Sequence, residues 1–218
     1  MRKPWIQIAI DALEMDRGKK LAQMAMNAGA DWIEVGTPLI TYQGIRAINE
    51  IAQVCVGKII VADFKAQDGV AKYFREAGRQ GAKIATVLGI VSDASIKAAI
   101  TGGREVGVKV TADMYSIKKS DLAVRARELE ILGVDYLMLH LGIDEINEDA
   151  TKHPLDGLLD LLTAVNIPVG VGTFNQEQAV EAVRMGASFV VQGEPILSVE
   201  NAEKKLSQFI RAVKTAVE

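Results

Sequence analysis

The chain has 218 residues, of which 49% are hydrophobic and only 5% aromatic, so aliphatic side chains supply most of its apolar mass. Its 25 basic and 28 acidic residues leave a formal charge of −3 without a basic block, which excludes a typical nucleic-acid-binding surface. The single cysteine, Cys55, excludes an internal disulfide, and no apolar run approaches the roughly 18 residues of a membrane span. We therefore expect a soluble, cytoplasmic protein that binds neither nucleic acid nor membranes.

Short apolar segments recur along the chain, and each closes on an acidic residue, a histidine or a glycine. Their ends fall about 25 residues apart, the length of one strand–helix unit in a parallel sheet. Because they are nearly continuous in aliphatic residues, they are typical of strands covered on both faces. The predicted strands are Trp5–Asp11, Asp31–Gly36, Lys58–Asp63, Lys83–Gly89, Val108–Asp113, Asp135–His140, Ile167–Gly172 and Ser188–Gly193.

The segments between these strands carry apolar residues at i, i+3, i+4 and i+7, the period of a helix with one buried face. The C-terminal segment has the clearest stripe, made of Leu206, Phe209, Ile210, Val213 and Val217. A repeat precedes four of the strands, in which a glycine can end a helix in the left-handed conformation. These glycines are Gly29, Gly81, Gly133 and Gly186.

Eight such units predict a single (β/α)₈ TIM barrel, an α/β fold, over residues 1–218. An open doubly wound sheet is the alternative, but the units are equal and no glycine-rich nucleotide motif accompanies them. No linker, low-complexity stretch or shift in composition marks a second domain.

In barrels of this kind the active site lies at the C-terminal ends of the strands, so the residues closing each strand are the functional candidates. Glu34 and Asp63 come from neighbouring strands and offer the hard oxygen ligands that Mg²⁺ prefers. Lys65, among carboxylates, would stay protonated and could stabilise an enolate or enediolate oxygen. His140 is the natural proton carrier among these groups.

The last two strands suggest a phosphate site. They end in Gly172-Thr173 and Gly193-Glu194, at positions where backbone N–H groups often bind a phosphate. A carboxylate beside a dianion is unfavourable unless it points away, so Glu194 stands against this interpretation.

Structural explanations stand beside the functional ones. Lys65 and its acidic neighbours could form an ion-pair network at the barrel rim, and His140 could be a satisfied strand-end histidine. His153, Lys118 and Lys119 are interpreted as surface residues, and Cys55, Trp5 and Trp32 as packing.

Residues 63–68 carry the D-x-K-x-x-D motif of the orotidine 5′-monophosphate decarboxylase suprafamily. Within it, the chain most resembles the 3-hexulose-6-phosphate synthases of archaeal type. The most specific segment is Trp-Ile-Glu-Val-Gly-Thr-Pro-Leu-Ile at residues 32–40. Further similarity falls at residues 13–17, 86–89, 112–113 and 140–144, so the resemblance runs almost end to end.

The resemblance implies an aldolase, a carbon–carbon lyase of the ribulose monophosphate pathway. It would condense formaldehyde with D-ribulose 5-phosphate to D-arabino-hex-3-ulose 6-phosphate, or run in reverse, through a metal-bound enediolate. Glu34 and Asp63 would hold Mg²⁺, or Mn²⁺ in its place. Lys65 would stabilise the enediolate, and His140 would carry the proton.

Three aspartates complete the implied site. Asp68 would enter the site of the partner in a homodimer, whereas Asp11 and Asp113 would bind substrate hydroxyls or assist proton transfer. The chain departs from the family at the phosphate end. Gly172-Thr173 replaces the usual Gly-Gly, and Gly193-Glu194-Pro195 replaces Gly followed by Gly or Arg.

These departures leave other functions open. One is a sister decarboxylase similar to 3-keto-L-gulonate-6-phosphate decarboxylase, although its usual basic residue soon after the strand-6 histidine is missing. Another is a diverged barrel with a different, non-phosphorylated ligand, or one that binds a ligand without turnover. Orotidine monophosphate decarboxylase itself fits less well, because the segments around Glu34 and His140 do not match its pattern.

Overall fold

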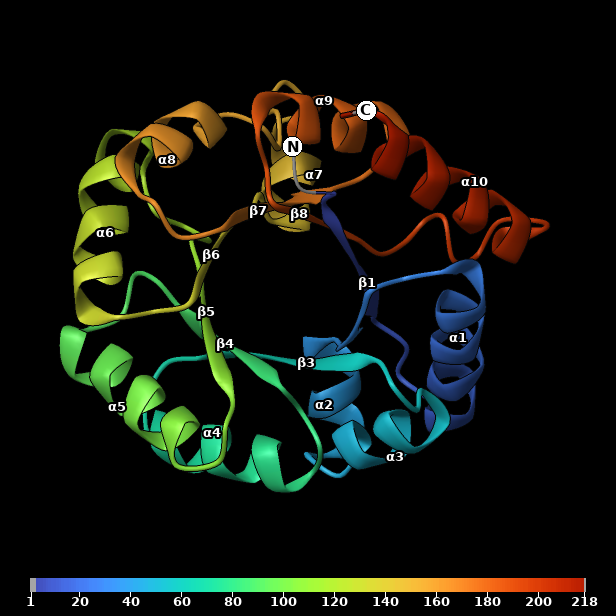
Figure 1. Cartoon of the computed structure of the whole chain (residues 1–218), viewed down its shortest axis with the longest axis horizontal. Helices are drawn as coiled ribbons and strands as arrows, with labels where there is room; N and C mark the ends of the chain where they lie inside the picture. Colours follow the sequence, from blue (N-terminus) through green and yellow to red (C-terminus); the bar gives the residue numbers. More distant parts are fainter. Residues whose placement is uncertain (1–2, 218) are drawn as a thin grey trace.

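The computed structural model describes residues 3–217 and places eight parallel strands in a closed barrel (Figure 1). Each strand pairs with the next along the chain, and β8 pairs with β1 to close the ring. The strands are β1 (Trp5–Ile10), β2 (Trp32–Val35), β3 (Ile59–Ala66), β4 (Ile84–Leu88), β5 (Lys109–Asp113), β6 (Tyr136–Leu139), β7 (Val169–Thr173) and β8 (Phe189–Gln192). The predicted TIM barrel is confirmed and the open sheet was wrong; Met1, Arg2 and Glu218 of the expected domain lie outside the described residues.

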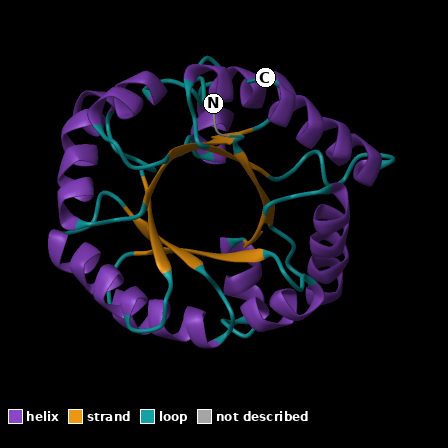
Figure 2. Ribbon diagram, in the orientation of Figure 1, coloured by secondary structure: helices purple, strands orange, loops and turns teal. Residues whose placement is uncertain are grey.

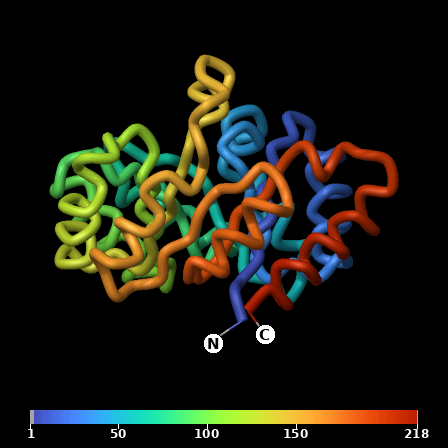
Figure 3. Tube along the Cα trace, turned by 90° about the horizontal axis from the view of Figure 1, so that it is seen from above, coloured from blue at the N-terminus to red at the C-terminus, as the bar shows by residue number. Residues whose placement is uncertain are grey.

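Helices form an outer ring around the strands (Figure 2). They are α1 (Met15–Ala28), α2 (Thr37–Gln43), α3 (Ala47–Val54), α4 (Val70–Arg79), α5 (Asp93–Arg104), α6 (Lys119–Leu132), α7 (Ile143–Glu148), α8 (Leu158–Ala164), α9 (Gln176–Met185) and α10 (Ala202–Thr215). Figure 3 shows α7 rising above the other helices, at the end of the barrel opposite the two termini. Among residues 3–217, no helix combines the length and apolarity that crossing a membrane requires.

The structure confirms the predicted glycine-terminated helices and the apolar face of the C-terminal helix. Gly29, Gly133 and Gly186 end α1, α6 and α9 in the left-handed conformation, and Gly81 adopts a positive φ just after α4. The buried face of α10 consists of Leu206, Phe209, Ile210 and Val213, whereas Val217 lies beyond the end of the helix. Cys55 directly follows α3 and is buried, as its interpretation as packing required.

Aromatic side chains fill the N-terminal half of the barrel interior. Trp5 stacks on Trp32 with ring centroids 5.1 Å apart, and Tyr136 and Phe189 pack against Trp32 from β6 and β8. This cluster confirms the packing role expected of the two tryptophans. Because side chains point inward at every second residue, the same strands present polar groups at the opposite end.

Most predicted strands end within a residue or two of the observed ones, but β3 is longer than expected. It continues from Asp63 to Ala66, and its pairing with β4 shifts register between Ala62 and Ala66. Lys65 lies inside this irregularity with φ 44°, a left-handed conformation that is costly for a residue with a side chain. Such strain is retained where the surrounding structure enforces it, which here is the C-terminal mouth of the barrel.

Candidate active site

A cavity of about 380 Å³ opens at the C-terminal mouth of the barrel. Its polar lining comes from the ends of β1, β2, β3, β6, β7 and β8, and Ile143 of α7 and Phe174 contribute to its apolar lining. The charged and titratable residues around it are Asp11, Glu34, Asp63, Lys65, His140 and Glu194. The predicted candidates therefore converge on one cavity, with the exception of Asp68 and the buried Asp113.

Asp63 is the most heavily bonded carboxylate of the mouth. Its Oδ1 accepts a hydrogen bond from Thr86 Oγ1 at 2.7 Å, and its Oδ2 accepts one from Thr37 Oγ1 at 2.7 Å. The Lys65 ammonium also forms an ion pair with Oδ2. Burial would raise the pKa of Asp63, but Lys65 and the two threonines together lower it below its ordinary value.

Lys65 is held through both its backbone and its side chain. Its N–H donates to Thr86 Oγ1 at 2.9 Å, which stabilises the strained φ. Its Nζ donates to Thr37 Oγ1 at 3.2 Å and lies 4.0 Å from Asp113 Oδ2. Although burial acts to lower the pKa of Lys65, the surrounding carboxylates raise it above the ordinary lysine value, so the side chain stays cationic.

Asp113 joins the lysine to the histidine. Its carboxylate is completely buried; Oδ1 accepts the Tyr115 N–H at 3.0 Å, and Oδ2 lies 2.9 Å from His140 Nδ1. In the neutral imidazole this pairing places the proton on Nδ1 and leaves Nε2 free to accept one. Burial lowers the pKa of His140, but the Asp113 charge outweighs it and raises the pKa above the ordinary value. Because the Asp113 carboxylate is completely buried, it is better placed to assist proton transfer than to bind a substrate hydroxyl directly.

Two further carboxylates lie near Asp63: Glu34 on the neighbouring β2, and Asp11 directly after β1. Glu34 is buried and accepts a hydrogen bond from Gln7 Nε2 of β1. Burial and then the charge of Asp63 raise the pKa values of both Glu34 and Asp11, that of Glu34 strongly. The mouth therefore concentrates negative charge that one lysine only partly offsets.

Glycine at residue 36 makes room for Asp11. A Cβ at Gly36 would lie 2.1 Å from Asp11 Oδ1, and one at Gly193 would lie 3.3 Å from Oδ2. Any side chain at position 36 would therefore displace the carboxylate. By contrast, a Cβ at Gly172 would meet only ordinary contacts, the nearest being Leu139 O at 3.9 Å, so this backbone borders open cavity space.

The ends of β7 and β8 are occupied by the protein's own groups. Thr173 Oγ1 lies 3.2 Å from Gln192 Oε1 inside the barrel, and the Phe174 N–H donates to Gln178 Oε1 at 2.9 Å. Glu194 Oε1 accepts a hydrogen bond from Ser198 Oγ at 2.6 Å. Side chains therefore engage one backbone N–H after β7 and hold the Glu194 carboxylate after β8, and the phosphate site stays a prediction.

Asp68 is not brought into the cavity. It follows β3 on the exposed loop before α4 and does not contribute to the cavity lining. Within residues 3–217 its carboxylate has no hydrogen-bond or ion-pair partner. Its predicted role in a partner subunit's site stays a prediction.

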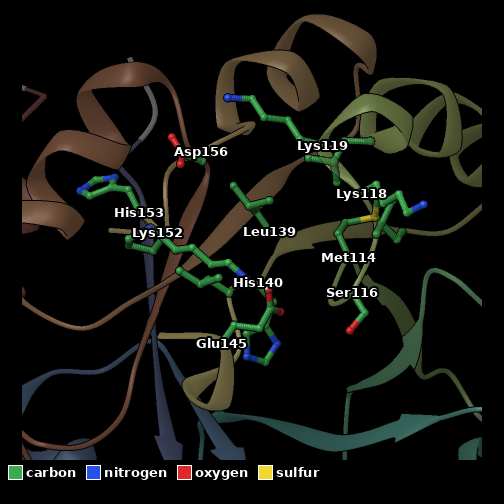
Figure 4. Close-up of a pocket in the computed structure, with 14 residues that line it drawn as sticks. Met114, Ser116, Lys118, Lys119, Leu139, His140, Glu145, Lys152, His153 and Asp156 are labelled. Atoms are coloured by element: carbon green, nitrogen blue, oxygen red, sulfur yellow. Dashed lines mark hydrogen bonds and ion pairs between the residues drawn. The ribbon is translucent and has the colours of Figure 1, made fainter. Parts of the chain in front are cut away.

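A second cavity, of about 440 Å³, adjoins the first at His140 and Leu141 (Figure 4). It lies between the segment that leads from β5 into α6 and the segment that follows β6. Lys118, Lys119 and His153 line it and are exposed, as expected of surface residues. His140 thus borders both cavities.

Sequence reasoning missed the residues that hold the candidate groups in place. Gln7, Thr37 and Thr86 are uncharged and resemble ordinary strand or turn residues. An inward period of two residues from Asp11 passes through position 7, so this spacing could have identified Gln7. The threonines fall within the resemblance segments 32–40 and 86–89, but their bonds to Asp63 follow from no local pattern, because Asp63 lies on another element.

The chain is similar to known proteins over nearly its whole length. Residues 4–209 match the model of the Orotidine 5′-phosphate decarboxylase / HUMPS family. A 3-hexulose-6-phosphate synthase of Staphylococcus epidermidis is 30% identical over 210 residues, covering 95% of this chain and 98% of that protein. The crystal structure of 3-hexulose-6-phosphate synthase from Salmonella typhimurium has a TM-score of 0.86 at 28% identity, covering 97% of this chain and 100% of the other.

A structure of 3-keto-L-gulonate-6-phosphate decarboxylase from Vibrio cholerae shares the same barrel. Its TM-score is 0.81 at 22% identity, over 99% of this chain and 97% of the other. At that identity the likeness concerns the fold alone. Together, the comparisons confirm the resemblance that the sequence motifs indicated.

Proposed function

Since the chain belongs to the Orotidine 5′-phosphate decarboxylase / HUMPS family, we propose that it is a 3-hexulose-6-phosphate synthase. It would be a carbon–carbon lyase that joins formaldehyde to D-ribulose 5-phosphate, or runs in reverse. The observation that carries the proposal is the relay of Asp63, Lys65, Asp113 and His140 at the barrel mouth. Relatives named 3-hexulose-6-phosphate synthase match nearly the whole chain and support the same reaction.

The relay has the groups that this reaction needs. His140 Nε2 would remove the proton from C1 of the sugar phosphate, while Asp113 holds Nδ1 and stabilises the imidazolium. The Lys65 ammonium, kept cationic by its carboxylate neighbours, would stabilise the enediolate oxygen. C1 then bonds to the formaldehyde carbon, and the proton passes to the oxygen that becomes the new hydroxyl.

The mouth also fits a divalent cation. Glu34 and Asp63 supply hard oxygen atoms. Burial and then the charge of Asp63 raise the pKa values of Glu34 and Asp11, and Mg²⁺ or Mn²⁺ would relieve the part that is due to charge repulsion. Among residues 3–217 no three acidic, histidine or cysteine groups form a ready metal cluster, so water and substrate oxygens would complete the ligand set. When bound, the metal would polarise the sugar carbonyl.

The catalytic proposal is tested by formaldehyde consumption with ribulose 5-phosphate. We expect consumption by the wild type and its loss in Lys65→Ala. A matched control is Lys72→Ala, which removes an exposed lysine of α4 and should keep full activity. A well-folded wild type that consumes no formaldehyde, or that instead releases carbon dioxide from 3-keto-L-gulonate 6-phosphate, would refute the proposal.

The metal proposal has a readout that does not depend on turnover. A ligand that binds only the folded state raises the melting temperature with its concentration. We expect Mg²⁺ to raise the melting temperature of the wild type, and expect Glu34→Gln to reduce that increase. Equal melting temperatures with Mg²⁺ and with EDTA would count against a metal in this mouth.

We also propose that the enzyme is a homodimer in which Asp68 enters the partner subunit's site. Its exposure and lack of an intrachain partner support this role. Lys65→Ala and Asp68→Ala should each be inactive, but a mixture refolded together should recover about a quarter of wild-type activity, because half of the dimers then carry one complete site. A monomer in sedimentation, or no recovery on mixing, would overturn the proposal.

A further inference from the structure

Three features at the ends of β7 and β8 weaken the expected phosphate site. The Phe174 N–H is already bonded to Gln178 Oε1 at 2.9 Å, and the Gln178 N–H to Asn175 Oδ1 at 2.9 Å. After β8, Pro195 has no N–H to offer, and the Glu194 carboxylate faces the cavity. A dianion at this end would meet the Glu194 charge and could not use the N–H of Phe174 or of residue 195.

One arginine compensates for this loss from another part of the chain. Arg17 extends from α1 across the seam where β1 pairs with β8, and its Nη2 donates to Ser198 Oγ at 2.8 Å. The same nitrogen lies 3.7 Å from Glu194 Oε1, which also accepts the Ser198 hydroxyl at 2.6 Å. The guanidinium and the hydroxyl thus hold a carboxylate at the edge of the cavity, with the donor types that hold a phosphate oxygen.

The Arg17–Glu194 pair is weakly held. Its side chains are 57% and 43% exposed, and exposed ion pairs contribute little to folding stability. A phosphate monoester carries more charge than a carboxylate and can accept two parallel hydrogen bonds from a guanidinium. A phosphate could therefore replace the Glu194 carboxylate beside Arg17 at a small cost in free energy. This exchange would also move the negatively charged Glu194 side chain away from the phosphate.

We propose that Arg17 and Ser198 bind the phosphate of the sugar substrate, and that the Glu194 carboxylate occupies their site until the substrate displaces it. Glu194 is then a built-in competitor that weakens sugar-phosphate binding and sets its specificity. The identity of the sugar phosphate rests on the proposed function, whereas the anion site itself does not.

Two variants separate the roles by steady-state kinetics with ribulose 5-phosphate and formaldehyde. Arg17→Ala should raise KM for the sugar phosphate at least tenfold with kcat within about twofold, because the reacting groups lie elsewhere in the cavity. Glu194→Gln should lower that KM several-fold. The matched control is Arg75→Ala, which breaks the exposed ion pair between Arg75 on α4 and Glu105 at the end of α5 and should leave KM unchanged.

Calorimetric titration with inorganic phosphate tests the site without any turnover. The wild type should bind phosphate, Glu194→Gln should bind it several-fold more tightly, and Arg17→Ala should bind it at least tenfold more weakly. Equal phosphate affinity in wild type and Arg17→Ala, or no binding by the wild type, would overturn the anion site. If the wild type lacks formaldehyde chemistry but shows the Arg17-dependent binding, the proposed reaction fails and the anion site stands.

Discussion

The buried Asp113 carboxylate should govern the proton chemistry of the site. The Asp113→Asn substitution keeps the side chain's shape and removes the negative charge that lies 2.9 Å from His140 Nδ1 and 4.0 Å from Lys65 Nζ. A hydrogen bond to a charged group contributes about 1.5–3 kcal/mol. Since 1.36 kcal/mol corresponds to a factor of ten, kcat for the formaldehyde reaction should fall about 10- to 150-fold.

The same substitution should change the titration of His140. In the wild type, burial lowers and Asp113 raises the pKa of the imidazole, with Asp113 prevailing. Without that charge, burial and the Lys65 ammonium remain, so the pKa should fall. The chain has two histidines, so nuclear magnetic resonance can follow His140 directly, while His153 on its exposed loop shows whether the substitution acts only locally.

The sign of the effect on stability follows from linkage. Because folding raises the pKa of His140, the folded state binds this proton more tightly than the unfolded state. The stabilisation is complete below the unfolded pKa of about 6.5 and is lost as pH rises through the folded pKa. Urea unfolding should show this loss in the wild type and a smaller one in Asp113→Asn. An unchanged His140 titration together with kcat within about twofold of wild type would refute the assigned role.

Three other substitutions or treatments test the site and its surroundings. Thr86→Val removes a buried donor to Asp63 and should cost about 1–3 kcal/mol, a loss of several degrees in melting temperature by calorimetry. Burial raises the pKa of the Cys55 thiol to about 11, so the native chain should resist a thiol reagent at pH 8 and react once unfolded in urea. Gly36→Ala should displace Asp11 and lower activity at least tenfold in the formaldehyde assay, since its Cβ would lie 2.1 Å from Oδ1.

Matched changes control these experiments. Thr111→Val alters another buried threonine, on β5, whose hydroxyl is not bonded to the Asp63 carboxylate, and it should cost less stability than Thr86→Val. Gly172→Ala adds a Cβ with ordinary contacts, so its melting temperature should be close to that of the wild type. The melting temperature of Gly36→Ala should be lower, because its Cβ would lie 2.1 Å from Asp11 Oδ1. Rapid labelling of native Cys55, or equal losses within either matched pair, would contradict the assigned contacts.

The repeat of strand and helix, the left-handed glycine ends and the residues that close each strand could all be predicted from the sequence. These features are local, because chain periodicity and turn chemistry act over a few residues. Since parallel strands bring their C-terminal ends to one mouth, the convergence of Asp11, Glu34, Asp63, Lys65 and His140 also followed from spacing.

The contacts that hold these groups in place depend on the closed barrel and could not be predicted from the sequence. The strained backbone of Lys65 depends on a register shift against β4, and the burial of Asp113 between Lys65 and His140 depends on β3, β5 and β6 together. The contact of Arg17 with Ser198 joins residues 181 positions apart across the seam between β1 and β8. No local pattern encodes such contacts, because they exist only once the barrel has closed.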